Sequence, residues 1–286
     1  MSKPIFTGAG IAIVTPFKKD LSIDYNLFEK HIDFLIENKA DALVIAGTTG
    51  EASALSFDEK MELVKVAKSK AAGRLKILAG AGANTTKEVI SLCHGYEKIG
   101  VDCLMVVTPY YNKPSQKGLI NHYTEIANSV TTEIMLYNVP SRTSLNMDAN
   151  TVATLANHEN ITCIKESSGD FSQIAQIANK IRNVDNFFMY AGNDDQITAS
   201  IALGAVGVVS VVGNIFPEVI HNMFSGSVEN SLNMQLDILE ITKALFSEPS
   251  PAPTKAALTH MSLSTNYLRP PMYEMENKEA ILSLLN

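Results

Sequence analysis

Three short apolar runs of this sequence end in residues that could act together on a carbonyl compound. One run, 161–164, leads into Lys165, a position where a solvated surface lysine is not expected. A second run, 134–136, ends at Tyr137, and a third, 42–46, opens into the turn Gly47-Thr-Thr-Gly-Glu51. If these runs are parallel strands of one sheet, their carboxyl ends bring an amine, a phenol and a hydroxyl into one cleft. This combination is the chemistry of an imine-forming aldolase.

Lys165 is the candidate nucleophile. A lysine whose stem lies among core side chains loses hydration, which disfavours its charged ammonium form. The neutral amine can then attack a ketone and form a protonated imine, which withdraws electrons from the neighbouring carbon. The alternative is a structural lysine that is paired with Glu166 or another carboxylate.

Tyr137 could supply the proton transfers that imine chemistry requires. Imine formation, carbon–carbon bond formation and hydrolysis each move protons, so a group that donates and accepts must lie within reach of the amine. A core tyrosine that bonds a backbone carbonyl is the alternative interpretation. Taken singly, the residue does not decide between the two.

Two further segments could bind carboxylates. The glycines of the turn 47–51 let backbone amides approach a small anion, although a tight turn with no ligand is equally typical of this composition. Arg142 follows a strand end in the turn Pro140-Ser-Arg-Thr143, where a planar guanidinium could hold a carboxylate at two points, or could form a surface salt bridge. The sequence lacks the G-x-x-x-x-G-K-[ST] pattern of a nucleotide phosphate loop.

The elements that must position these residues recur along the chain. Continuous apolar runs begin roughly 20 to 35 residues apart, which leaves room for one helix between each pair and is typical of strands buried on both faces. They cover residues 11–15, 42–47, 76–80, 103–108, 133–138, 161–166, 187–192 and 206–212. Eight strand–helix units in sequence predict an α/β fold, a closed (β/α)8 TIM barrel. We expect the catalytic barrel to occupy residues 1–225.

The chain continues beyond the predicted barrel. Residues 226–286 are expected to form a helical extension packed on it, with helices over 232–246, 254–263 and 278–285. Within the barrel, Ser56-x-x-Glu59 and Thr85-x-x-Glu88 have the form of capping boxes at two helix starts. Gly73 and Gly100 are expected to end those two helices.

Composition excludes several classes of function. The 286 residues carry 30 acidic and 23 basic side chains, a net charge of −7, which argues against nucleic acid or an anionic membrane as the main partner. No apolar stretch has the length of a bilayer span, and the first residues lack the pattern of a signal peptide, so we expect a cytoplasmic protein. Cysteines 93, 103 and 163 are predicted to be buried reduced thiols.

Metal-dependent chemistry is disfavoured. The histidines fall in predicted helices or connecting segments rather than at strand ends, at positions 31, 94, 122, 158, 221 and 260. None forms an H-x-H or H-E-x-x-H pattern, so no metal site is expected. A serine nucleophile of the G-x-S-x-G type is also absent from the sequence.

Four motifs together resemble a known family. They are Thr48-Thr-Gly-Glu51, Thr108-Pro-Tyr-Tyr-Asn-Lys-Pro-Ser115, Tyr137-Asn-Val-Pro-Ser-Arg-Thr143 and Ile164-Lys-Glu-Ser167. As an ordered set they are similar to the pyruvate-dependent class I lyases, and among these to the dihydrodipicolinate synthases. The resemblance runs from about Phe6 to the C-terminus. The arginine in Pro-Ser-Arg-Thr favours this group over the N-acetylneuraminate lyases, in which none is expected at this turn.

The resemblance implies an activity and a role for each site residue. Lys165 would form an imine with pyruvate, which would then condense with L-aspartate 4-semialdehyde in the first committed step of diaminopimelate and lysine biosynthesis. No cofactor beyond this covalent imine would be needed. The amides of Thr48 and Thr49 would bind the pyruvate carboxylate, and Arg142 would bind the second substrate. Tyr137, the Thr48 hydroxyl and Tyr111 would form a proton relay. Gly192 and Val209 would line the pocket.

The resemblance also implies an assembly. In the family, the residue at the position of Tyr111 reaches into the site of a neighbouring subunit, so a homodimer would be the minimum active unit and a tetramer the usual one. Inhibition by lysine, where it occurs, uses a cleft at the dimer interface. Its positions here are Ser53, Phe57, Lys60, Gly82, Asn84, Glu88 and Tyr110.

Three positions depart from the family pattern, in two regions of the chain. Asn193 replaces a common aspartate, but the contact implied there runs through the backbone. Phe57 and Lys60 replace polar or histidine side chains of strongly inhibited members. Because the Lys60 cation would repel a lysine ammonium group, we predict weak or absent feedback inhibition by lysine.

A different class of function remains as an alternative. A barrel could bind a small keto acid as a sensor or scaffold without turning it over. A pure binder gains little from a buried amine beside two tyrosines, so the sequence favours the enzyme.

Overall fold

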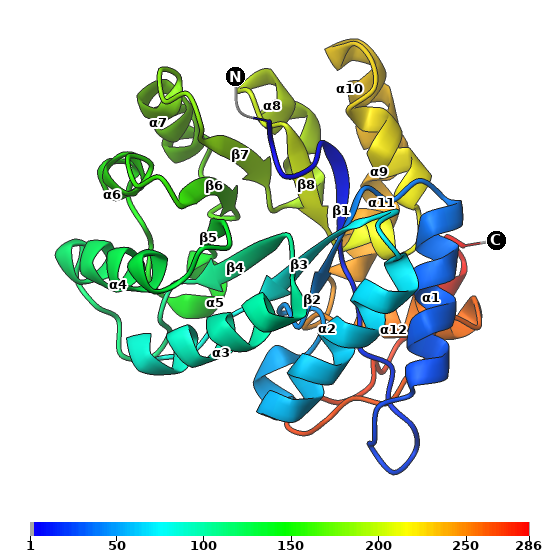
Figure 1. Ribbon diagram of the computed structural model, residues 1–286. Helices are drawn as coiled ribbons and strands as arrows, with labels where there is room; N and C mark the ends of the chain where they lie inside the picture. The colour runs from blue at the N-terminus through cyan, green and yellow to red at the C-terminus, as the bar shows by residue number, and fades with distance from the viewer. Residues whose placement is uncertain (1–2, 286) are drawn as a thin grey trace.

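A computed structural model describes residues 3–285 as a closed barrel of eight parallel strands. The strands follow one another around the barrel in chain order, and β1 pairs with β8 to close it (Figure 1). They are β1 (Gly8–Ala12), β2 (Ala42–Ile45), β3 (Lys76–Gly80), β4 (Cys103–Val107), β5 (Ile134–Asn138), β6 (Ile161–Glu166), β7 (Phe188–Ala191) and β8 (Gly207–Ser210). The predicted TIM barrel is therefore confirmed.

The helices form the outer layer of the barrel (Figure 1). They are α1 (Tyr25–Glu37), α2 (Phe57–Ala71), α3 (Thr86–Ile99), α4 (Gln116–Ser129), α5 (Pro140–Thr143), α6 (Ala149–Leu155), α7 (Phe171–Ile181), α8 (Ile197–Ala202) and α9 (Pro217–Met223). Short 3-10 turns η1 (Ala52–Ala54), η2 (Asp194–Gln196) and η3 (Val212–Asn214) follow strands β2, β7 and β8. Three of the eight strand ends therefore lead into a compact 3-10 turn.

The first strand lies earlier than the sequence predicts. The apolar run predicts a strand over 11–15, whereas β1 is Gly8–Ala12. The reason is that Gly8 pairs with Gly207 and Gly10 with Ala42, so the register with β8 and β2 uses residues of low strand propensity. Position 10 also requires a glycine, because a Cβ there would lie only 2.5 Å from the Phe6 ring.

The two predicted capping boxes differ. Ser56 and Glu59 form the full reciprocal box at the start of α2. At α3, the Thr85 hydroxyl accepts from the Glu88 amide, but the Glu88 carboxylate accepts from the Thr85 hydroxyl instead of its backbone amide. Gly100 ends α3 in the left-handed conformation, whereas the left-handed C-cap of α2 is Ala72, one residue before Gly73.

The C-terminal segment adds four helices within the described residues. They are α10 (Val228–Asp237), α11 (Leu239–Leu245), α12 (Ala252–His260) and α13 (Glu279–Leu282). Every residue from Ala252 to Leu258 is buried, and the segment lies beside α1, where Lys30 Nζ donates to the Ser262 carbonyl at 2.9 Å (Figure 1). The predicted helix 232–246 is thus two helices, while the division of the chain at residue 225 stays a prediction.

The core has two layers. Strand residues that point inward, including Val44, Met105 and Met135, form one cluster inside the barrel. Outward-pointing strand residues pack against the helices in a second, larger cluster. This alternation decides which strand residues can reach a site inside the barrel. Among residues 3–285, no helix is both long enough and apolar enough to cross a membrane.

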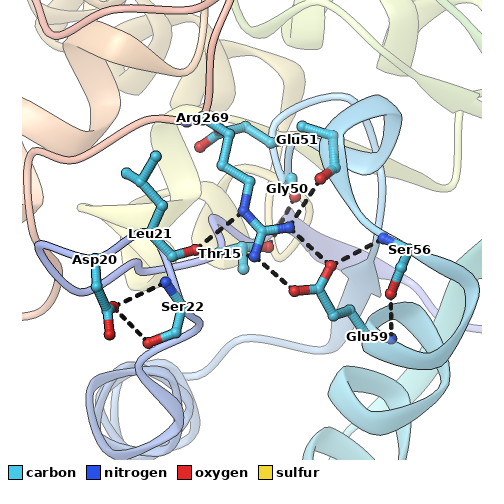
Figure 2. A network of polar contacts seen from close by, with 10 residues as sticks. Thr15, Asp20, Leu21, Ser22, Gly50, Glu51, Ser56, Glu59 and Arg269 are labelled. Carbon is cyan, nitrogen blue, oxygen red and sulfur yellow. Dashed lines mark hydrogen bonds and ion pairs between the residues drawn. The ribbon is translucent and has the colours of Figure 1, made fainter.

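Arg269 ties the C-terminal segment to α2 and to the loop before α1. Figure 2 shows its guanidinium between the Leu21 carbonyl, which it contacts at 2.9 Å, and the Glu59 carboxylate, which it contacts at 2.5 and 2.7 Å. Hydrogen bonds from Arg269 lower the pKa of Glu59 from its ordinary value of 4.5 to about 2. The ionised carboxylate therefore stabilises the fold above pH 4.5, and this stability is lost as the pH falls toward 2.

We expect Glu59→Gln to reduce the acid sensitivity of the fold. Because the pair is partly exposed, the fall in the free energy of unfolding between about pH 7 and pH 3 should be about 1 kcal/mol smaller in the variant than in the wild type. Urea unfolding at the two pH values measures this difference. An equal fall in both proteins would mean that the Glu59–Arg269 pair does not titrate as described.

Candidate active site

Lys165 and Tyr137 are neighbours inside the barrel. They are directly paired residues of β6 and β5, and the Lys165 Nζ lies 4.2 Å from the centroid of the Tyr137 ring. The two side chains are only 6% and 5% exposed. The strand pairing therefore brings together the amine and the phenol that the sequence analysis singled out.

Glu166 does not pair with Lys165. Because successive strand residues point to opposite faces, the Glu166 carboxylate lies outside the barrel interior, where it accepts from Asn138 Nδ2 at 3.0 Å and from the Ser168 amide at 2.6 Å. Burial raises the pKa of Glu166. Within residues 3–285, no ion pair joins Lys165 to any carboxylate. The structural alternative for this lysine thus finds no partner in the described part of the chain.

The turn that follows β2 offers two free backbone amides. Its own hydrogen bonds run from Gly50 N to Gly47 O and from Glu51 N to Thr48 O, each at 3.1 Å. In the described chain, no hydrogen bond uses the amides of Thr48 or Thr49. Thr49 is buried and Thr48 half-buried. Two adjacent unpaired donors are suited to a carboxylate, which accepts several hydrogen bonds.

A cavity of about 650 Å³ opens beside these residues. Thr48, Tyr137 and Arg142 line it, and Lys165 lies next to it against the Tyr137 ring. Arg142 belongs to the short helix α5, is exposed, and makes no side-chain hydrogen bond or ion pair within residues 3–285. Its guanidinium is therefore available to an anion in the cavity.

Gly192 and Val209 border the same interior. Gly192 follows β7, and a Cβ there would lie 1.7 Å from the Ser167 hydroxyl oxygen, so no larger residue fits without a shift. Val209 of β8 is buried in the inner cluster that contains Tyr137. Neither residue is among those that line the cavity, so their predicted part in the pocket stays a prediction.

The comparisons with known proteins identify the family of the chain. The model of the dihydrodipicolinate synthetase family matches residues 5–282. The chain belongs to this family. The family resemblance predicted from the sequence is thereby confirmed.

Curated relatives carry the name 4-hydroxy-tetrahydrodipicolinate synthase. The chain is 42% identical to the one from Caldicellulosiruptor saccharolyticus over 279 residues, which cover 96% of this chain and 94% of the relative. It is 43% identical to synthase 1 of Clostridium acetobutylicum over 278 residues, again 96% and 94% of the two chains. Such identity over almost the whole length extends the similarity to the C-terminal helices.

Solved structures of the same family have the same fold. Dihydrodipicolinate synthase from Thermotoga maritima superposes with a TM-score of 0.96 at 36% identity, covering 99% of this chain and 98% of that one. The enzyme from Aquifex aeolicus gives a TM-score of 0.92 at 34% identity, covering 98% and 96%. The barrel and its C-terminal helices are thus shared with these synthases.

One predicted site residue of this family member lies apart from the others. Tyr111 is 91% exposed, with a left-handed φ of 71°, and does not line the cavity. Its neighbour Tyr110 does line it, and the Tyr110 amide donates to Asn84 Oδ1 at 3.0 Å. A single chain therefore does not bring the Tyr111 phenol to its own Lys165.

The predicted effector cleft is continuous with the active site in a single chain. The same cavity that Tyr137 lines is also lined by Ser53, Phe57, Lys60, Gly82, Asn84, Glu88 and Tyr110. Burial lowers the pKa of Lys60. Weak or absent inhibition by lysine stays a prediction.

Asp194 was not found by sequence reasoning. It is 1% exposed, accepts hydrogen bonds from the Ser210 hydroxyl and from Val211 N at 2.9 Å, and feels the charge of Lys165. Burial raises its pKa, and its hydrogen bonds and Lys165 oppose that rise. The carboxylate thus joins the turn after β7 to the end of β8. Its position two residues after Gly192 was the available signal, but nothing in the spacing indicated burial.

Metal ligands are not grouped in the described residues. Among residues 3–285, no three His, Cys, Asp or Glu side chains are arranged to hold a metal ion. Cys93, Cys103 and Cys163 are buried free thiols, as predicted.

Proposed function

We propose that this member of the dihydrodipicolinate synthetase family condenses pyruvate with L-aspartate 4-semialdehyde through an imine on Lys165. The product would be 4-hydroxy-tetrahydrodipicolinate, and the step the first committed one toward diaminopimelate and lysine. One observation carries the proposal, namely the buried Lys165 amine 4.2 Å from the Tyr137 ring with no ion pair to a carboxylate in residues 3–285. The names of the relatives support the same reaction.

The reaction begins at the pyruvate ketone. The uncharged Lys165 amine attacks C2, water leaves, and a protonated imine forms. Loss of a proton from C3 gives an enamine, and this carbon attacks the aldehyde of the second substrate, whose oxygen takes up a proton. The amino group of that substrate then attacks C2, closes the ring and displaces Lys165. No redox change occurs, so the covalent imine serves in place of a cofactor.

Each proton transfer needs a group that can both donate and accept. The Tyr137 ring centroid lies 4.2 Å from the amine, and we assign Tyr137 this role together with the Thr48 hydroxyl. Tyr111 would complete the relay from a neighbouring subunit, because its side chain is exposed and does not line the cavity of its own chain. The active unit would then be at least a homodimer, and we expect a tetramer.

Two anion sites would orient the substrates. The free amides of Thr48 and Thr49 would bind the pyruvate carboxylate, and Arg142 the carboxylate of the semialdehyde. Gly192 and Val209 would line the pocket near the imine. We also infer a cytoplasmic location, with neither nucleic acid nor membrane as partner. The substrates, the net charge of −7 and the buried thiols support this inference.

Borohydride reduction in the presence of pyruvate tests the proposal. Reduction of the imine should leave a covalent adduct on the wild-type chain, which intact mass and peptide mapping assign to Lys165. A coupled assay with both substrates should show turnover. An unmodified enzyme that keeps full activity would end the proposal, and an adduct without product from any aldehyde would favour a keto-acid sensor.

Arg142→Ala should separate the two substrates. Loss of a charge-assisted contact to a carboxylate is expected to raise KM for aspartate semialdehyde by about 10- to 100-fold, while the pyruvate adduct forms as in the wild type. Arg182→Ala is the matched control, since Arg182 is exposed at the end of α7 and does not line the cavity. An unchanged KM in Arg142→Ala would contradict this role.

A further inference from the structure

The turn that carries Thr48 and Thr49 is held from the far end of the chain. Glu51, the last residue of this turn, accepts hydrogen bonds on both carboxylate oxygens from the C-terminal segment. Lys255 Nζ contacts Oε1 at 2.5 Å, and the backbone amide of Arg269 contacts Oε2 at 3.1 Å. These partners are 204 and 218 residues away in sequence.

Lys255 is among the most buried charged residues of the described chain. Its side chain is 0% exposed, and Nζ also donates to the Tyr267 carbonyl at 2.8 Å and lies 4.2 Å from the Phe17 ring centroid. Burial lowers the pKa of Lys255 to about 8, and the Glu51 carboxylate opposes this shift. A buried ammonium is costly unless its hydrogen bonds and its counter-charge are provided, so Lys255 and Glu51 depend on each other.

Glu51 itself has a backbone conformation that needs support. Its φ is 57°, in the left-handed region that is unfavourable for a residue with a Cβ. Residues persist there only when surrounding contacts fix them. The Glu51 amide donates to the Thr48 carbonyl, so the position of Glu51 is coupled directly to the residue whose amide is free.

We propose that Lys255 and the Arg269 backbone are positioning residues of the substrate carboxylate site. They fix Glu51, Glu51 fixes the turn, and the turn aims the free amides of Thr48 and Thr49 into the cavity. This inference rests on the proposed function, because it assigns those amides to the pyruvate carboxylate. The C-terminal segment would then position the active site in addition to packing against the barrel.

The experiment measures pyruvate affinity independently of turnover. Wild type and variants are treated with borohydride over a range of pyruvate concentrations, and the adduct on Lys165 is quantified by mass. In Lys255→Met, the half-saturating pyruvate concentration should rise about tenfold or more, because the uncompensated Glu51 carboxylate moves toward water and pulls the turn with it. The yield of adduct at saturating pyruvate should stay close to that of the wild type.

Two further variants distinguish positioning from plain stability. Lys255→Met/Glu51→Gln removes the uncompensated charge and should recover at least about threefold of the lost affinity. Glu59→Gln is the matched control. It removes a carboxylate that accepts hydrogen bonds from the Arg269 guanidinium but makes none with the residues of the turn. It should lower the Tm while pyruvate affinity stays within about twofold of the wild type.

The outcomes are separable. If the wild type forms no adduct, the proposed function fails. If the wild type forms the adduct and Lys255→Met lowers only the Tm with unchanged pyruvate affinity, the positioning role is overturned and the function stands. If Lys255→Met does not fold, Glu51→Gln provides the test. The side-chain NH2 group introduced by this substitution must face either Lys255 Nζ or the Arg269 backbone amide. Both of these are donors, so one of the two hydrogen bonds is lost. A half-saturating concentration equal to that of the wild type in this variant would likewise overturn the proposal.

Discussion

Lys165→Ala is expected to lower the rate of condensation by at least about 10³- to 10⁴-fold, the largest effect of any single substitution in this chain. Without the amine, pyruvate cannot form the imine that makes its C3 acidic, and the remaining contacts only bind the ketone. The borohydride adduct should disappear completely. The coupled assay with pyruvate and aspartate semialdehyde measures the rate, and intact mass measures the adduct.

The control for this substitution must separate chemistry from folding. Lys180→Ala removes an exposed lysine of α7 and should leave both rate and adduct unchanged. Thermal unfolding of Lys165→Ala checks that the barrel is intact, since the change truncates a buried stem. If Lys165→Ala still forms the adduct at wild-type yield, the imine must form on another lysine, and the basis of the proposed function is lost.

The fold could be predicted because its signal repeats. Each buried parallel strand is a continuous apolar run, and the predictions 76–80 and 161–166 coincide with β3 and β6. The first strand was misplaced because Gly8 and Gly10 carry no apolar side chain to reveal them. Their place in the sheet depends on pairing with β2 and β8, which local sequence does not report.

The site was predictable where it lies at strand ends. Lys165 and Tyr137 each end an apolar run, and parallel neighbours bring such ends together. Asp194 and Lys255 were missed because their significance depends on contacts with residues far along the chain. Lys255 lies in a helix of the C-terminal segment, where nothing local indicates a pair with Glu51. Tyr111 illustrates another limit, since its predicted partner would be a second chain.

Tyr137→Phe is the second large expected effect. The variant keeps the aromatic ring against Lys165 and removes only the hydroxyl, so packing and the cavity shape are retained. Loss of a general acid–base group should lower kcat by about 10²- to 10³-fold. The rate of adduct formation should fall as well, because imine formation also moves protons, yet at saturating pyruvate the adduct should still reach full yield.

Tyr123→Phe is the matched control for Tyr137→Phe. Tyr123 is as buried as Tyr137, but its hydroxyl donates to the Val106 carbonyl at 3.0 Å and does not face the cavity. Its loss should therefore lower the Tm and leave kcat within about twofold of the wild type. If Tyr137→Phe instead behaves like Tyr123→Phe, with kcat retained, Tyr137 is a structural core tyrosine. The proton transfers would then have to run through the other members of the proposed relay, the Thr48 hydroxyl and Tyr111 of a neighbouring subunit.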